Sequence, residues 1–136
     1  MRFFLIGLLV TVLGACVEQT PVKSDKLVLP EQGQIGLYYF RTSVRCETCN
    51  AIEKIIQDEL AGKYEGDLKS GRLVFRQFNL DEADCAKFAG QFDVVFKSLV
   101  VLKDSQQVNL TEEAFLYVLP KPEKFKAILE QTIDQF

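Results

Sequence analysis

Residues 35–40 read IGLYYF, and after a short polar link they are followed by the cysteine pair Cys46-Glu47-Thr48-Cys49. The first run is apolar and rich in β-forming side chains, so it predicts a buried strand. From Ala51 to Leu60, apolar residues recur at helical spacing. The sequence therefore predicts a strand followed by a helix, with two cysteines where the helix begins.

The spacing of Cys46 and Cys49 predicts a dithiol redox site. A helix start presents unpaired N–H groups and the positive end of the helix dipole, and both favour a thiolate. Cys46 is therefore the expected nucleophile, and Cys49, on the first turn, is the expected resolving thiol with which it closes a disulfide. Arg45 is expected to stabilise the Cys46 thiolate further, while Glu47 opposes it. Each effect is at most ~1 kcal/mol at an exposed site, so an extreme oxidant is not predicted.

Strand and helix patterns alternate along the rest of the chain. The run 73–78 is rich in β-formers, and Asp81 is placed to cap a following helix. Gly62 is expected to end the first helix in the left-handed conformation, and residues 63–71 leave room for a short helical turn. The remaining expected elements are a strand at 98–102, a polar turn at 103–107, a second hairpin strand at 108–110 and a helix from Pro122.

The order β-α-β-α-β-β-α predicts an α/β domain over residues 34–136, with a central mixed β-sheet flanked by helices. Right-handed βαβ crossovers place helices on the faces of such a sheet. The cysteine pair then lies at the edge where open α/β sheets place their chemistry. This arrangement resembles the thioredoxin fold.

Residues 1–15 are predicted to be a lipoprotein signal peptide. Arg2 gives a positive start, an apolar run follows, and the segment closes on Leu13-Gly14-Ala15-Cys16. This ending resembles the lipobox of bacterial lipoproteins, which implies cleavage before Cys16, a diacylglyceryl group on its sulfur and an acylated amino terminus. The apolar run is too short to span a membrane. A plain secretory peptide and a buried apolar strand are the alternatives.

Residues 16–33 are expected to be the lipidated cysteine and a tether, because they are mostly polar and contain two prolines. Residues 27–29 would alternatively form a short edge strand. The protein would then be lipid-anchored in the bacterial cell envelope, facing the periplasm or the exterior. Val17, in place of an aspartate after Cys16, favours the outer membrane if the source is Gram-negative.

Composition excludes several kinds of chemistry. The chain contains no histidine, which removes histidine metal sites and Ser-His or Cys-His nucleophile pairs. Beyond residue 15, 15 basic residues stand against 19 acidic ones without a basic stripe, so no nucleic-acid partner is expected. No cofactor is expected either. Cys46, Cys49 and Cys85 would offer three thiolates to a metal, but a four-ligand zinc site would lack its last ligand.

A closer family resemblance rests on residues 37–40 (LYYF), 45–53 (RCETCNAIE) and 70–75 (SGRLVF). These segments are similar to the thioredoxin-like family of ArsF-type nitrophenyl-compound nitroreductase subunits, in which Tyr-Tyr-Phe and Arg-Cys-x-Thr-Cys-x-Ala-Ile-Glu are the signature. The resemblance covers most of the chain after Cys16 and implies the fold and the redox pair. It leaves open whether a nitro compound is involved.

Two departures from thioredoxins bear on mechanism. Lys97 stands where thioredoxins carry a cis-proline beside the sulfurs, so a trans peptide is expected there. Lys97 either places a cation near Cys46 and stabilises its thiolate or is a solvated loop lysine. Thioredoxins keep a buried aspartate behind the cysteines, and the corresponding position here is near Phe40. Glu53 is expected at the surface. No carboxylate is therefore expected to shuttle a proton to Cys49.

The leading hypothesis is thiol-disulfide exchange or electron relay with a protein partner that bears a disulfide or a dithiol. The alternatives are a structural disulfide in a redox-inactive binding or assembly subunit and a thiolate metal carrier. Cys85 shares an expected helical face with aromatic residues, which favours a buried core thiol over a second resolving cysteine. Val44 and Phe96 are expected either to pack in the core or to form a partner-docking patch.

Overall fold

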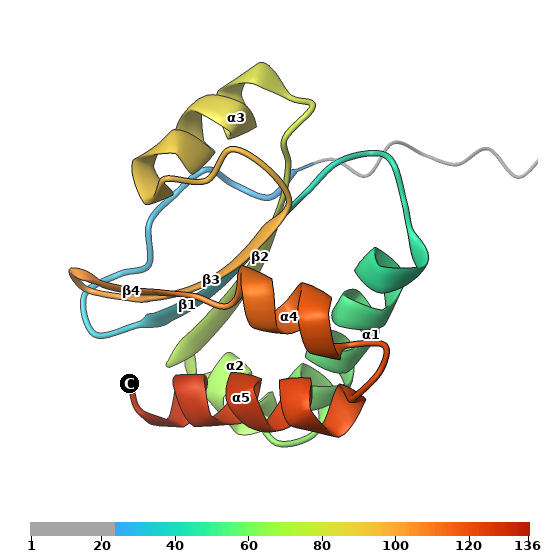
Figure 1. Ribbon diagram of the computed structural model, residues 1–136. Coiled ribbons are helices and arrows are strands. Elements are labelled where there is room, and N and C mark those ends of the chain that lie inside the picture. The colour runs from blue at the N-terminus through green and yellow to red at the C-terminus, as the bar shows by residue number, and fades with distance from the viewer. Residues whose placement is uncertain (1–23) are drawn as a thin grey trace, which may run out of the picture.

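Strand β1 (Ile35–Arg41) lies at the centre of a four-stranded mixed sheet in the computed structural model, which describes residues 24–136 (Figure 1). β1 pairs in parallel with β2 (Leu73–Asn79) and antiparallel with β3 (Ser98–Lys103). β4 (Gln106–Asn109) completes a hairpin with β3, so the strand order is β2-β1-β3-β4. The predicted α/β class, with a mixed sheet flanked by helices, is confirmed.

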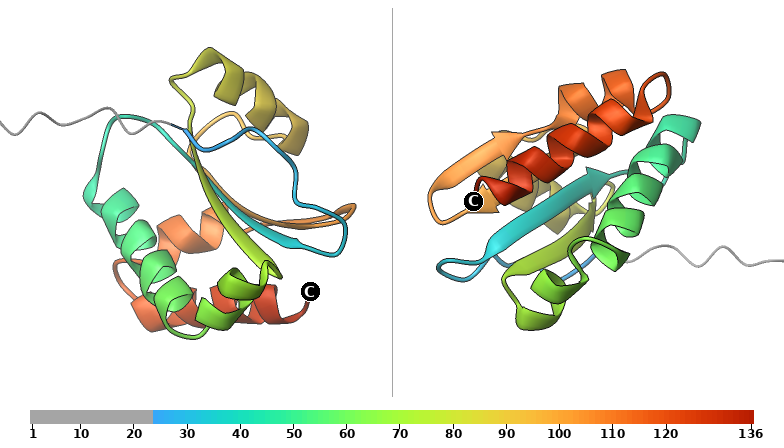
Figure 2. Two further views of the ribbon diagram at one scale, coloured as in Figure 1. Left: turned by 180° about the vertical axis from the view of Figure 1, so that it is seen from behind. Right: turned by 90° about the horizontal axis from the view of Figure 1, so that it is seen from below.

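Helices cover both faces of this sheet, as Figures 1 and 2 show. α1, α4 and α5 lie on one face, together with the short α2, and α3 lies on the opposite face. α4, which follows the hairpin directly, was not predicted from the sequence. The helices are α1 (Glu47–Ala61), α2 (Glu65–Ser70), α3 (Ala83–Ala89), α4 (Thr111–Tyr117) and α5 (Pro122–Asp134), with a 3-10 turn η1 (Gly90–Phe92) after α3.

The alternation of side chains along β1 divides the core into two clusters. Leu37 and Tyr39 belong to the cluster under α1, α4 and α5, whereas Tyr38 and Phe40 belong to the cluster under α3. All four are fully buried. Because β1 is covered on both faces, its sequence is apolar throughout instead of alternating with polar residues.

The ends of the first helices differ from the expectation. α1 ends at Ala61, but Gly62 has φ −101° and is therefore not left-handed. Its N–H donates to the carbonyl oxygen of Asp58, and the chain continues directly toward α2. A left-handed glycine instead follows α2: Gly71, with φ +77°, turns the chain into β2.

Asp81 was predicted to cap α3, but the N-cap residue of α3 is Glu82. The Asp81 carboxylate accepts a hydrogen bond of 2.8 Å from the Ser43 N–H, because the loop after β1 lies beside the turn after β2. β4 also begins two residues earlier than expected. The hairpin turn consists only of Asp104 and Ser105, with Asp104 in the left-handed region.

Residues 24–33, expected as part of a tether, lie against the domain. The Asp25 N–H donates to the Gln77 carbonyl at 2.9 Å, and the Gln77 N–H donates to the Asp25 carboxylate at 2.7 Å. The segment does not form a regular strand at residues 27–29. The earlier part of the expected tether, the predicted signal peptide and the predicted lipidation site Cys16 lie outside the described residues.

This segment crosses the sheet at a point that requires glycine. The Tyr38 hydroxyl donates to the Val28 carbonyl oxygen at 2.5 Å. A Cβ added at Gly36 would lie 2.5 Å from Cγ of Pro30 and 2.9 Å from the Tyr38 ring, so a side chain at this position would push the segment away.

Within residues 24–136, no helix combines the length and the apolar character needed to cross a membrane.

Candidate redox site

Cys46 and Cys49 form a disulfide at the N-terminus of α1, with their Cα atoms 5.1 Å apart. Cys46 is the N-cap residue in an extended conformation, and the Cys49 N–H donates to Cys46 Sγ at 3.2 Å. A sulfur thus occupies the place where a serine or aspartate oxygen usually caps a helix. This position favours negative charge on Cys46 Sγ when the disulfide is open.

The two cysteines differ in their access to solvent. Cys46 is partly exposed, whereas Cys49, on the first turn of α1, is only 1% exposed. An incoming sulfur therefore reaches Cys46 first. The difference fits the expected division of roles, with Cys46 as the nucleophile and Cys49 as the resolving thiol.

Arg45 is engaged by an acidic partner. Its guanidinium makes two hydrogen bonds of 2.5 Å to the Glu53 carboxylate and another of 2.8 Å to Asn50 Oδ1. The hydrogen bond to Glu53 raises the pKa of Arg45. The positive charge expected to stabilise the Cys46 thiolate is thus shared with Glu53, one helical turn beyond Cys49.

Glu53, which was expected at the surface, is partly buried and forms ion pairs. Its side chain is 20% exposed, and Arg41 Nε lies 3.7 Å from Glu53 Oε1, the oxygen that also accepts from Arg45 Nη1. The neighbouring Tyr39 is fully buried, its hydroxyl has no hydrogen-bond partner, and burial raises the pKa of Tyr39 to about 12. The phenol is therefore neutral, and Phe40 lies in the opposite cluster. No carboxylate projects from β1 toward the sulfurs.

Lys97 reaches the disulfide from the loop before β3. Its ammonium lies 3.4 Å from Cys49 Sγ and donates to the Val44 carbonyl oxygen at 3.0 Å. The lysine thus stands at a sulfur, as one interpretation expected, but at Cys49 instead of Cys46. Among residues 24–136 no peptide bond is cis, in line with the trans peptide expected at Lys97.

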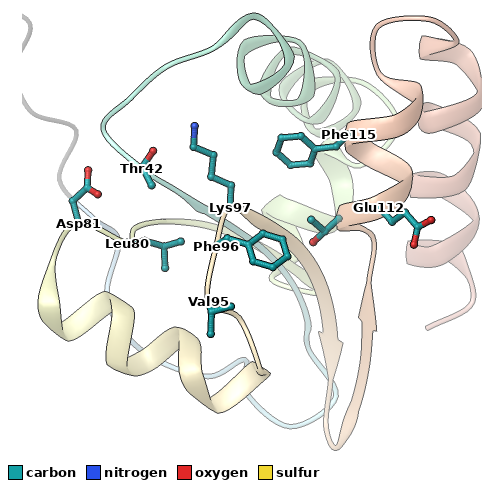
Figure 3. A pocket seen from close by; sticks show the side chains of 9 residues that line it. Thr42, Leu80, Asp81, Val95, Phe96, Lys97, Glu112 and Phe115 are labelled. Carbon is teal, nitrogen blue, oxygen red and sulfur yellow. The ribbon is translucent and has the colours of Figure 1, made fainter.

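An apolar groove opens beside Lys97, with a volume of about 720 Å³ (Figure 3). Phe96 and Phe115 contribute aromatic rings to it from the loop before β3 and from α4, and Leu80 and Asp81 line its other side. Val95 and Phe96 are 83% and 64% exposed. Val44 is also exposed, so of the two expectations for Val44 and Phe96, packing in the core is wrong. Phe115 was missed because α4 was not predicted.

Cys85 lies on the other face of the sheet. It is 1% exposed within the aromatic cluster, as expected for a core thiol, and its sulfur lies 2.9 Å from Ser24 Oγ. Burial raises the pKa of the Cys85 thiol. The described residues contain no group of three or more histidine, cysteine, aspartate or glutamate side chains placed to hold a metal ion. The three-thiolate site is therefore not assembled, because Cys85 is not beside Cys46 and Cys49.

Comparison with known proteins adds little to this geometry. No protein-family model and no curated protein matches the chain. A solved structure described as "Structure of a malarial protein" is 18% identical, with a TM-score of 0.41, and the match covers 61% of this chain and 93% of that one. A likeness of that size carries no argument about function. The site and the fold together define an α/β domain with a Cys-x-x-Cys disulfide at a helix N-terminus.

Proposed function

We propose that this protein is a membrane-anchored, extracytoplasmic thiol-disulfide oxidoreductase or electron-relay protein with a thioredoxin-like domain. One observation carries the proposal: the Cys46–Cys49 disulfide caps α1 with one sulfur accessible and the other buried. Thiol-disulfide exchange needs an accessible thiolate for attack and a second thiol held beside it for release. The pair supplies both within one helical turn.

The reaction follows from these roles. The Cys46 thiolate attacks one sulfur of a partner disulfide, the partner S–S bond breaks, and its electron pair leaves on the partner's other sulfur. The Cys49 thiolate then attacks Cys46 Sγ, and the partner departs as a dithiol. The partner gains two electrons, and this protein is left with its own disulfide. The same steps in reverse oxidise a dithiol partner.

The groove beside Lys97 is the docking surface in this proposal, and its occupant is an extended apolar segment next to the partner's cystine. Continuity with the reacting sulfurs supports this choice, because Lys97 both lines the groove and contacts Cys49 Sγ. The exposed side chains of Val95 and Phe96 would lose water-accessible apolar area when such a segment binds. Partner affinity would then depend on Phe96 and Phe115.

The location proposed for this chemistry rests on the sequence. A lipid anchor on Cys16 would hold the domain at a membrane surface of the bacterial cell envelope, facing the periplasm or the exterior. Disulfides persist in such oxidising compartments. The outer membrane is favoured if the source is Gram-negative, because valine follows Cys16. The resemblance to ArsF-type nitroreductase subunits supports the redox pair and leaves the final electron acceptor open.

The test is capture of the partner. The full-length Cys49→Ser variant should accumulate a mixed disulfide through Cys46, which non-reducing electrophoresis and mass spectrometry will identify. Cys46→Ser is the matched control, since the remaining Cys49 is only 1% exposed and should capture far less. If Cys49→Ser captures nothing and its Cys46 thiol is unreactive toward alkylation, the disulfide is structural. The protein is then a redox-inactive binding or assembly subunit.

A further inference from the structure

Each sulfur of the disulfide has its own electrostatic partner. The Cys49 N–H points at Cys46 Sγ from inside α1, at 3.2 Å. The Lys97 ammonium approaches Cys49 Sγ from the loop before β3, at 3.4 Å. The Val44 carbonyl oxygen also accepts from the Lys97 ammonium, at 3.0 Å, and holds the lysine in this position. The two contacts come from different elements and do not compete.

We propose that Lys97 stabilises the thiolate form of Cys49 when the disulfide is open, so that the buried cysteine is activated separately from Cys46. The inference rests on the proposed redox function and assigns Lys97 a step in it. Helix geometry alone does not provide this activation, because the amide at the helix start is directed at Cys46 Sγ. An ammonium beside a largely buried sulfur is less screened by water than an exposed ion pair.

The other charged groups near this end of the sheet are either engaged elsewhere or exposed to solvent. Arg45 and Arg41 both face Glu53. Asp81 accepts the Ser43 N–H, and this hydrogen bond, together with the nearby Lys97 charge, lowers the pKa of Asp81. Glu112 lines the groove and is exposed, as is Glu47 on the first turn of α1. In the part of the chain that the structure describes, Lys97 is the charged side chain in contact with Cys49 Sγ.

The contact matters most when a donor dithiol reduces the protein. A donor thiolate attacks the accessible Cys46 Sγ, a donor–Cys46 disulfide forms, and the Cys46–Cys49 bond breaks. The electron pair and the negative charge arrive on Cys49 Sγ, beside the Lys97 ammonium, and no proton moves. The donor's second thiolate then displaces Cys46, so that the donor is oxidised by two electrons and this protein is reduced. Thiolates of lower basicity leave faster, so Lys97 speeds the first step.

The proposal predicts a distinct pH signature. Loss of the lysine charge is expected to reduce the acid dissociation constant of the Cys49 thiol about tenfold, which is about one pKa unit. At a pH above the Cys49 pKa of both forms, the equilibrium constant for reducing the disulfide should be close to tenfold lower without the lysine charge, or about 30 mV. At a pH below both of these pKa values the Cys49 thiol is protonated with or without the lysine charge, and the difference should vanish.

The direct test follows Cys49 alone in the full-length Cys46→Ser variant, where no disulfide couples the two sulfurs. Carbon-13 NMR of labelled cysteine reports the Cys49 titration separately from Cys16 and Cys85. Adding Lys97→Met should raise the Cys49 pKa by about one unit, and Lys97→Arg should restore most of the original value. Lys54→Met is the matched control, because it also removes one lysine charge, on α1, and leaves the contact between Lys97 and Cys49 Sγ intact.

The outcomes separate this inference from the proposed function. An unchanged Cys49 titration in a folded Lys97→Met variant would overturn the role of Lys97, whatever the disulfide does. If Lys97→Met fails to fold, Lys97→Gln decides, because the amide keeps a donor for the Val44 carbonyl and lacks the charge. A disulfide that dithiothreitol never opens in the wild-type protein would instead remove the redox function, and the Cys46→Ser titration would still report on Lys97.

Discussion

The two faces of the sheet are built differently. One face is covered by α1, α2, α4 and α5, and its cluster is mostly aliphatic, with Leu37, Ile52 and Leu129 among its buried members. The other is covered by α3, η1 and the segment from residue 24, over a cluster of five aromatic rings. Neighbouring rings have centroids 5.0–6.5 Å apart, and the rings belong to Tyr38, Phe40, Phe78, Phe88 and Phe92.

The difference shows that the two faces of one small sheet serve different purposes: the aliphatic face positions the cysteine pair, and the aromatic face mainly stabilises the fold. Each aromatic ring buries a large area, so a short helix is enough to close the aromatic face. The aliphatic face needs longer helices, and the N-terminus of one of them carries the disulfide. The position of the Cys46–Cys49 pair therefore depends directly on the aliphatic face and only indirectly on the aromatic one.

The largest expected effect is on the aromatic face. Phe78 is fully buried, stacks on Phe40 with centroids 5.0 Å apart and contacts Phe88 at 5.2 Å. Phe78→Ala should lower the free energy of unfolding by about 3–5 kcal/mol, as measured by urea denaturation. In the molecules that remain folded, the alkylation rate of reduced Cys46 should be unchanged. A changed rate would show that the two faces are coupled and would remove the distinction.

The second prediction concerns the aliphatic face. Ile52 is fully buried and lies one turn beyond Cys49 on α1. Ile52→Ala should cost about 2–5 kcal/mol, because it leaves a cavity between α1 and the sheet. Unlike Phe78→Ala, it should also change the alkylation rate of reduced Cys46 in the folded protein, since it loosens the helix that holds both cysteines. Equal rates in the two variants would contradict this.

The third prediction uses two adjacent tyrosines that point to opposite faces. The Tyr38 hydroxyl donates to the Val28 carbonyl, and burial raises the pKa of Tyr38, so it remains a donor at neutral and mildly alkaline pH. Tyr38→Phe should cost about 0.5–1.5 kcal/mol and speed hydrogen exchange in residues 24–30. Tyr39→Phe is the matched control, because its buried hydroxyl has no partner, and it should be neutral or stabilising. A larger loss of unfolding free energy from Tyr39→Phe than from Tyr38→Phe would show that the Tyr39 hydroxyl, and not that of Tyr38, makes the stabilising hydrogen bond.

The order of strands and helices around the cysteines was predictable, because a strand buried on both faces and an amphipathic helix leave clear periodic patterns. α4 left no such pattern, although it supplies Phe115 to the groove. The packed segment from residue 24 was also missed, since polar residues and prolines suggest a tether while hydrogen bonds to β2 depend on tertiary contacts.

The sequence identified the residues of the candidate site better than their contacts. The resemblance to thioredoxins predicted that Lys97 lies near the sulfurs. It did not predict which sulfur, because the contact with Cys49 Sγ joins residues 48 positions apart in the chain. Arg45 next to Cys46 suggested a thiolate partner, yet its guanidinium reaches Glu53, one helical turn beyond Cys49. Local proximity in the chain does not determine where a long side chain finds its ion pair.

The smallest expected effect lies at the edge of the aliphatic face, where Asp134 of α5 accepts hydrogen bonds from the Lys63 ammonium at 2.6 Å and the Tyr64 hydroxyl at 2.8 Å. The bond from Lys63, followed by that from Tyr64, lowers the pKa of Asp134. A carboxyl group with a lowered pKa stabilises the fold above its unfolded pKa of about 3.9, and this stabilisation is lost as pH falls through the folded pKa.

Asp134→Asn should therefore reduce the free energy of unfolding at neutral pH by no more than about 1 kcal/mol, because the carboxylate is half exposed and solvent screens it. Urea denaturation from pH ~7 to ~3 should show the difference from wild type shrinking below pH ~4, where the wild-type carboxyl becomes protonated. Asp58→Asn, which breaks a more exposed pair with Lys54 within α1, should have a smaller effect. A constant difference across this range would mean that shape, and not charge, joins α5 to the turn before α2.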